Sequence, residues 1–146
     1  MPRDPLSTLI RLRRSACEDA QHHVVRCLSA EAQAERAALE VEHSIARETQ
    51  AASDPSGPDS VVEAFAAWLP GARRRLEEAR RTLETLQAET ARARAGLSAC
   101  KTALESVETL QQERRSAARA ARERAWQQEL DDRPPRRTES GEDGLG

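Results

Sequence analysis

The side chains best suited to chemistry in this chain are its three histidines and three cysteines, namely His22, His23, His43, Cys17, Cys27 and Cys100. His22 lies five residues from Cys17 and five residues from Cys27. A metal site built on one helix needs ligands about three or four residues apart, because only those residues share a face. The spacing therefore predicts no metal site. Exposed histidines beside thiols packed in a helix seam explain the pattern better.

The remaining sequence lacks the patterns that carry catalysis, such as a nucleophile elbow, a phosphate-binding loop or an acid pair with a pocket. Unpaired cysteines without a CxxC motif are typical of a reducing cytosol, where thiols pack as small apolar groups. The N-terminal segment has no apolar core of the signal-peptide kind, and no run approaches the ~20 apolar residues of a membrane span. We therefore expect a cytoplasmic protein that is not an enzyme and needs no cofactor.

A cluster of arginines near the C-terminal end is the most concentrated charge in the chain, and it comprises Arg114, Arg115, Arg119, Arg122 and Arg124. Only Glu113 and Glu123 lie among these residues, Trp126 follows them, and the net charge of the whole chain is −2. Three interpretations stay open: a solvated helix face, a surface for an acidic protein, and a nucleic-acid patch. The last is the least favoured, because Trp126 is the only aromatic residue near the cluster.

The element that carries these residues is a long helix, as composition and periodicity show. Ala, Glu, Arg, Leu and Lys make up more than half of the 146 residues, and aromatic residues only 2%. Such a composition with a heptad repeat is typical of coiled coils. From about residue 5 to 51, ten of the twelve positions in two heptad rows are apolar, Arg13 and Glu31 being the exceptions. The rows are 10, 17, 24, 31, 38, 45 and 6, 13, 20, 27, 34, 41.

A second heptad pattern follows a turn. Residues 53–60, "SDPSGPDS", are a turn by composition, and Ser60 with Glu63 matches a capping box. Twelve of the thirteen positions in the next two rows are apolar. The rows are 62, 69, 76, 83, 90, 97, 104 and 65, 72, 79, 86, 93, 100. Because the phase is unchanged through Pro70, we expect a kinked helix there and not a break.

These patterns predict an all-α protein: a long two-helix antiparallel coiled-coil hairpin whose second helix extends beyond the first. The first helix covers residues 1–52, the loop 53–60 and the second helix 61–132, and we expect 133–146 to be disordered. With the loop centred near residue 56, Leu6 faces about residue 105. Residues 106–131 then protrude without a partner over about 39 Å. An isolated helix of this length is only marginally stable, so it is expected to fray, self-associate or dock on a partner.

Two of the three aromatic residues lie just before Pro70-Gly71, close to the expected tip of the hairpin. Phe65 falls on a seam row, which predicts that it closes the end of the core. Trp68 lies on neither row, and a large apolar side chain on the flank of a thin hairpin predicts a contact surface. The neighbouring arginines at 73–75 are interpreted as solubilising surface.

The chain resembles the FliJ family of flagellar export stalk and chaperone proteins, and their injectisome relatives of the YscO type. Three segments carry the resemblance: "PLSTLIRLRR" at the start, "AFAAWLPGAR" at the head of the second helix, and "LETLQQERRSAARAARERAWQQELDD" at its end. Together they place the resemblance over about residues 4–132.

The resemblance implies a stalk that inserts into a hexameric export ATPase and contacts the export gate protein. It further implies contact with export chaperones, no binding of nucleic acid, and a place at the inner membrane through these partners alone. The implied gate surface consists of Phe65, Leu69 and Ala72, with Leu76 at the following position and Pro70 as a departure inside the motif. We add Trp68 to this surface because of its position off both heptad rows. The implied ATPase surface lies at the open end, with the start of the first helix and Arg114, Arg115, Arg119, Arg122 and Trp126.

A different class of protein also fits the periodicity. A generic coiled-coil adaptor or scaffold would oligomerise through residues 106–131, because their seam is unpaired in the single chain. Neighbouring flagellar export genes would favour the export stalk, and a stable dimer that is lost on truncation would favour the adaptor.

Overall fold

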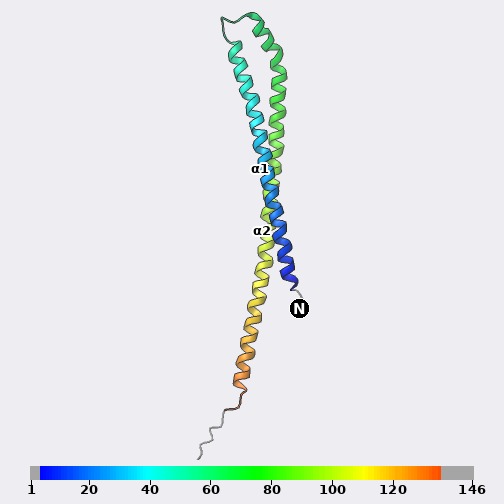
Figure 1. The fold of residues 1–146 in the computed structure, drawn as a ribbon, viewed down its shortest axis with the longest axis vertical. Coiled ribbons are helices and arrows are strands. Elements are labelled where there is room, and N and C mark those ends of the chain that lie inside the picture. The colour runs from blue at the N-terminus through cyan, green and yellow to red at the C-terminus, as the bar shows by residue number, and fades with distance from the viewer. Residues whose placement is uncertain (1–3, 136–146) are drawn as a thin grey trace, which may run out of the picture.

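The computed structural model describes residues 4–135, which form two long antiparallel helices (Figure 1). Helix α1 spans Pro5–Ala52 and helix α2 spans Asp59–Asp131. Asp4 caps α1, because its carboxylate accepts a hydrogen bond from the Leu6 amide at 3.1 Å. Most of the tail expected to be disordered, residues 136–146, lies outside the described residues. The prediction of an all-α hairpin with a longer second helix is confirmed.

The two helices share a core that is one layer of side chains thick. The most buried residues all lie on the expected heptad rows, and they are Ile10, Val24, Ala38, Ala72, Thr90 and Ala93. Thr90 is the polar exception, and its hydroxyl donates to the Leu86 carbonyl oxygen at 3.0 Å. Its burial therefore leaves no unpaired donor. These most buried positions hold small and medium-sized side chains, while the leucines and Phe65 of the same rows are half-buried.

The helix pairing differs in register from the one expected. Gln111 donates from its side-chain amide to the Ser7 hydroxyl at 3.1 Å, whereas the expected register puts residue 104 opposite Ser7. Arg14 forms an ion pair with Glu108 at 3.0 Å. Residues 106–111 are therefore paired with α1, and the unpaired extension is residues 112–131, about 30 Å long.

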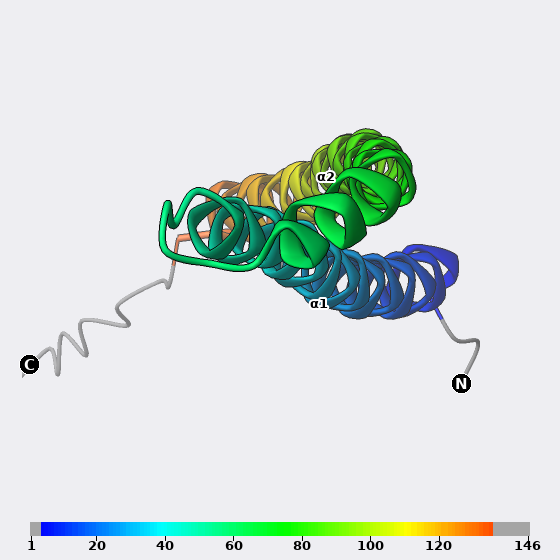
Figure 2. The ribbon, with the colours of Figure 1, turned by 90° about the horizontal axis from the view of Figure 1, so that it is seen from above.

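The shift originates at the tip of the hairpin. Figures 1 and 2 show the first turns of α2 leaning across the end of α1 before the helix runs down beside it. The capping box expected at Ser60 is not formed, because α2 begins at Asp59 after Pro58, with no side-chain cap. Val62, expected in the seam, is 50% exposed as a result. Helix α2 continues through Pro70 without interruption.

A cysteine pair offers a direct test of the register. Cys17 of α1 and Cys100 of α2 are both half-buried, and they lie near enough for the Cys100 thiol to affect the pKa of Cys17. Partial burial and the Cys100 thiol raise the pKa of Cys17. We expect diamide to join the two within one chain, and faster at about pH 9 than at about pH 7, because the thiolate is the form that reacts.

The products can be assigned by non-reducing electrophoresis and peptide mass spectrometry. Cys27→Ser should retain the crosslink, because Cys27 lies almost three turns, about 15 Å, from Cys17 along α1. Cys100→Ser should lose it. A Cys27–Cys100 product in place of Cys17–Cys100 would contradict the register described above.

Candidate partner-binding surfaces at the two ends of the hairpin

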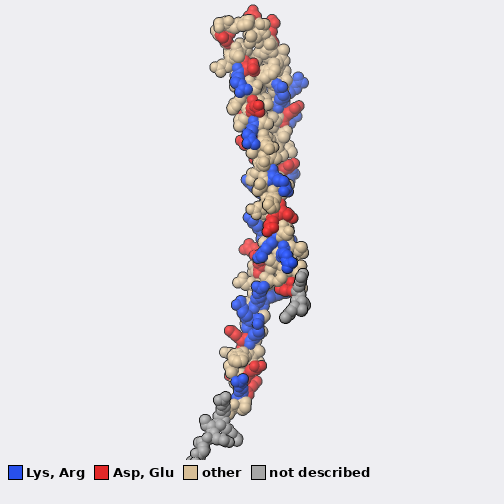
Figure 3. Space-filling model, in the orientation of Figure 1, with Lys and Arg blue, Asp and Glu red and all other residues tan. Residues whose placement is uncertain are grey.

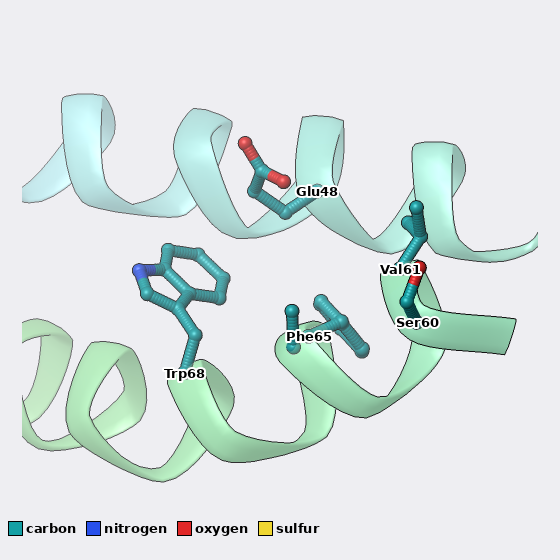
Figure 4. A pocket seen from close by; sticks show the side chains of 6 residues that line it. Glu48, Ser60, Val61, Phe65 and Trp68 are labelled. Atoms are coloured by element: carbon teal, nitrogen blue, oxygen red, sulfur yellow. The ribbon is translucent and has the colours of Figure 1, made fainter. Parts of the chain in front are cut away.

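The tip of the hairpin presents an aromatic recess between the two helices. Phe65 and Trp68 of α2 have ring centroids 6.1 Å apart with their planes tilted by 38°. Both side chains point from α2 toward α1, where Glu48 lies across from them (Figure 4). Ser60, Val61 and Ala64 complete the lining of this recess. We call these six residues the tip recess.

Trp68 does not lie on the flank of the hairpin, where its heptad position puts it. It is half-buried between the helices, because the leaning start of α2 opens a space that the indole enters. The Arg75 guanidinium carbon lies 6.0 Å from the Trp68 ring centroid, within cation–π range. Trp68 and Arg75 also line a second recess with residues 40–47 of α1. The indole thus lines two recesses, and one of them also contains two arginines, Arg47 and Arg75.

The residues of the implied gate motif differ in exposure. Phe65, Leu69 and Leu76 are half-buried along the seam. Ala72 is 0% exposed, so its side chain meets other parts of this chain and offers no surface to a partner. Ala72 therefore cannot contact a partner directly. Pro70, by contrast, lies on the exposed side of α2.

The tip also carries a charge that the sequence analysis missed. From residue 48 to residue 72 there are four acidic residues, Glu48, Asp54, Asp59 and Glu63, and no lysine or arginine. The Asp54 carboxylate accepts from the Ser56 hydroxyl at 2.7 Å and from its amide at 3.0 Å, and these bonds lower the pKa of Asp54. Figure 3 shows acidic side chains at this end. A count of charges by segment finds this signal in the sequence alone.

The open end of the hairpin has the opposite character. Arg115, Arg119, Arg122 and Trp126 are spaced by four, three and four residues, which places them on one face of the extension. We call these four residues the basic face. Its first two arginines line a recess with Arg14 of α1. Trp126 is 58% exposed, and Figure 3 shows basic side chains gathered where α1 begins.

Arg114 does not belong to this face. It follows the seam rows beyond their last paired residue, so it lies roughly 100° around the helix from Arg115. Arg124 lies on yet another side and donates to the Ala120 carbonyl oxygen at 3.4 Å. Within residues 4–135, none of the ion pairs involves an arginine of the extension. The basic face is thus open to a partner.

The described part of the chain offers neither a metal site nor a membrane-spanning helix. Residues 4–135 contain no group of three His, Cys, Asp or Glu side chains placed to hold a metal ion. Cys27 Sγ lies 3.8 Å from His23 Nε2, but these two side chains are a pair and not a group of three. None of the described helices is long and apolar enough to cross a membrane.

The fold and its two ends define a class of protein: a non-globular, stalk-like helical hairpin with different surfaces at the tip and at the open end. The chain matches the family model described as "Flagellar FliJ protein" over residues 2–138. It therefore belongs to the FliJ family, and it is a component of the flagellar protein export apparatus. No curated protein and no solved structure matches the chain.

Proposed function

We propose that this chain is the central stalk of a flagellar export apparatus, inserting its open end into a hexameric export ATPase and contacting the export gate protein with its tip. The observation that carries the proposal is the opposite character of the two ends. The tip is aromatic and acidic, whereas the extension is basic and unpaired. The 73 residues of α2 hold these ends about 110 Å apart. A rod of that kind suits a protein that bridges two partners.

The gate-binding surface is the tip, with Phe65, Trp68, Leu69 and Leu76 as its apolar contacts. Their half-burial leaves part of each side chain for a partner. Val61, at 40% exposure, and Val62 extend the apolar area toward the loop. Ala72 supports this surface from inside the seam, where its side chain is fully buried.

The ATPase-binding surface is the basic face with the start of α1. Its guanidinium groups suit acidic residues lining the ring of a hexameric partner, because charge complementarity steers and orients association. Trp126 adds the kind of large apolar anchor that dominates binding energy at interfaces. The cytoplasmic side of the inner membrane is where such a stalk would work, held there by its partners, with export chaperones as further partners.

A second candidate function is supported by one specific feature. The extension continues the seam as an alanine stripe, formed by Ala117, Ala118, Ala121 and Ala125, and all four residues are exposed. A second copy could cover this stripe and make the chain a dimeric coiled-coil adaptor. Sedimentation equilibrium distinguishes the two: a stable dimer at micromolar concentration favours the adaptor, and a monomer that binds the export ATPase favours the stalk.

Trp68→Ala tests the gate surface. We expect about tenfold weaker binding to the purified cytoplasmic fragment of the gate protein, since a buried tryptophan anchor contributes about 1–3 kcal/mol. Helicity measured by circular dichroism should stay near that of the unchanged chain. Isothermal titration calorimetry measures the affinity.

Trp126→Ala is the matched control, because it removes the other tryptophan from the opposite end. It should leave gate binding unchanged and weaken ATPase binding. If the unchanged chain binds neither the gate fragment nor the ATPase, the proposed function is wrong. If Trp68→Ala unfolds much of the helix, Trp68 is a structural residue and the gate surface lies elsewhere.

A further inference from the structure

The tip recess combines a carboxylate with two aromatic rings. Glu48 projects from α1 with its stem facing Trp68 and its carboxylate turned back along α1, while Phe65 and Trp68 project from α2 (Figure 4). Glu48 takes part in none of the ion pairs formed within residues 4–135. The recess therefore offers a negative charge beside two ring systems with no cation from this chain.

This combination of groups selects a cation. The face of an aromatic ring attracts an ammonium or guanidinium group, and a carboxylate binds the same group through charge-assisted hydrogen bonds. An anion would be repelled by Glu48. A purely apolar side chain would cover the carboxylate without offering it a hydrogen bond, which costs free energy.

The other side of Trp68 shows that this ring already accommodates such a ligand. Arg75 places its guanidinium carbon 6.0 Å from the indole centroid, in the recess lined by residues 40–47. That recess also contains an acidic residue, Glu40, and a second arginine, Arg47. The tip recess likewise places Trp68 beside an acidic residue, Glu48, but no arginine lines it.

The charge around the recess favours the same kind of ligand. Residues 48–72, which form the turn and the start of α2, carry four acidic side chains and no basic ones, and the nearest arginines are Arg47 and those at 73–75, on the side of the segment away from the loop. A positively charged segment would therefore be attracted to the tip and would dock on it with its cation next to Glu48.

We propose that the tip recess binds an arginine side chain presented by the export gate protein, with its guanidinium on the Glu48 carboxylate and its stem against Phe65 and Trp68. Arginine suits the recess better than lysine because its planar group both stacks on rings and pairs with carboxylates. The identity of the partner rests on the proposed function, while the selection of a cation rests on the recess itself.

Glu48→Gln is the test, with Glu63→Gln as its matched control. Both residues are exposed acids near the tip and both changes remove one negative charge, but only Glu48 lines the recess. We expect Glu48→Gln to weaken binding of the gate's cytoplasmic fragment roughly fivefold, as for a partly exposed ion pair, and Glu63→Gln to weaken it less than about twofold. Isothermal titration calorimetry measures both.

Equal losses for the two variants would overturn the arginine proposal, because binding would then depend on the overall charge of the tip. If Trp68→Ala still weakened binding in that case, the proposed gate surface would stand without the cation. The two proposals are thus distinguishable.

A second measurement keeps the cation test independent of the gate. In the Trp126→Phe variant Trp68 is the only tryptophan, because the chain has two. Its fluorescence is titrated with blocked hexapeptides of one sequence that contain either arginine or its neutral analogue citrulline. A stronger response to arginine, lost in Glu48→Gln, supports the recess as a cation site. Equal responses to the two peptides would overturn it.

Discussion

Among single substitutions in the seam, Ala72→Glu is expected to destabilise the hairpin most. Ala72 is the most buried residue of α2, with 0% of its surface exposed, and it lies on a heptad row that faces α1. A glutamate there must either push the helices apart or bury a carboxylate without a partner. Overpacking and unpaired charge each cost free energy, so we expect a loss of about 3 kcal/mol or more.

Urea unfolding followed by circular dichroism measures this loss as a lower transition midpoint. Ala88→Glu is the matched control, because Ala88 lies on the exposed side of the same helix and the residue change is identical. Its effect should stay within about 0.5 kcal/mol, as for most surface substitutions. Similar midpoints for the two variants would show that the tip opens readily in solution, and the burial of Ala72 would be contradicted.

The heptad rows could be predicted from the sequence because the core of this molecule has only one interface. Each helix buries a single stripe, so a repeat of seven identifies the inward residues directly. Ile10, Val24, Ala38 and Ala93 are buried as their rows require. Thr90, the one polar residue in the second pair of rows, is buried as well, because its hydroxyl bonds to its own helix.

The register could not be predicted in the same way. A heptad pattern says which residues face the partner helix, but a shift by seven residues leaves the pattern unchanged. The position of the loop was the only guide to the register, and the expected register requires α2 to turn back directly after the loop. The leaning start of α2 instead moved Gln111 opposite Ser7 and brought Val62 out of the seam.

The two candidate sites also differ in whether the sequence predicts them. The basic face could be predicted because it lies on a regular helix, where spacing alone decides which arginines are neighbours, and strict use of that spacing would have left Arg114 out. The tip recess could not, because it depends on how α2 leaves the loop. Trp68 lies on neither heptad row, yet it points toward α1 because of the direction in which α2 leaves the loop.

The paired substitution Arg119→Glu and Arg122→Glu is expected to have the largest effect on function. Both residues belong to the basic face, and reversing them turns an attraction for an acidic surface into a repulsion. Losses of several kcal/mol are typical of close charge pairs at interfaces, so we expect binding to the export ATPase to weaken about a hundredfold. Stimulation of ATP hydrolysis should disappear with it, as measured in a coupled assay of phosphate release.

Arg114→Glu with Arg124→Glu is the matched control, because it changes the net charge equally but on other sides of the same helix. We expect it to weaken binding far less, and we expect the unfolding midpoint to stay unchanged in both double variants, since no arginine of the extension forms an ion pair within residues 4–135. If binding is lost in the basic-face variant and kept in the control, the ATPase recognises one side of a rigid helix. Equal losses would mean that the partner senses only the overall charge, and the basic face would then not be the binding surface. The difference between the two variants should also shrink at high salt, because exposed charges are screened within about 10 Å at about 0.1 M ionic strength.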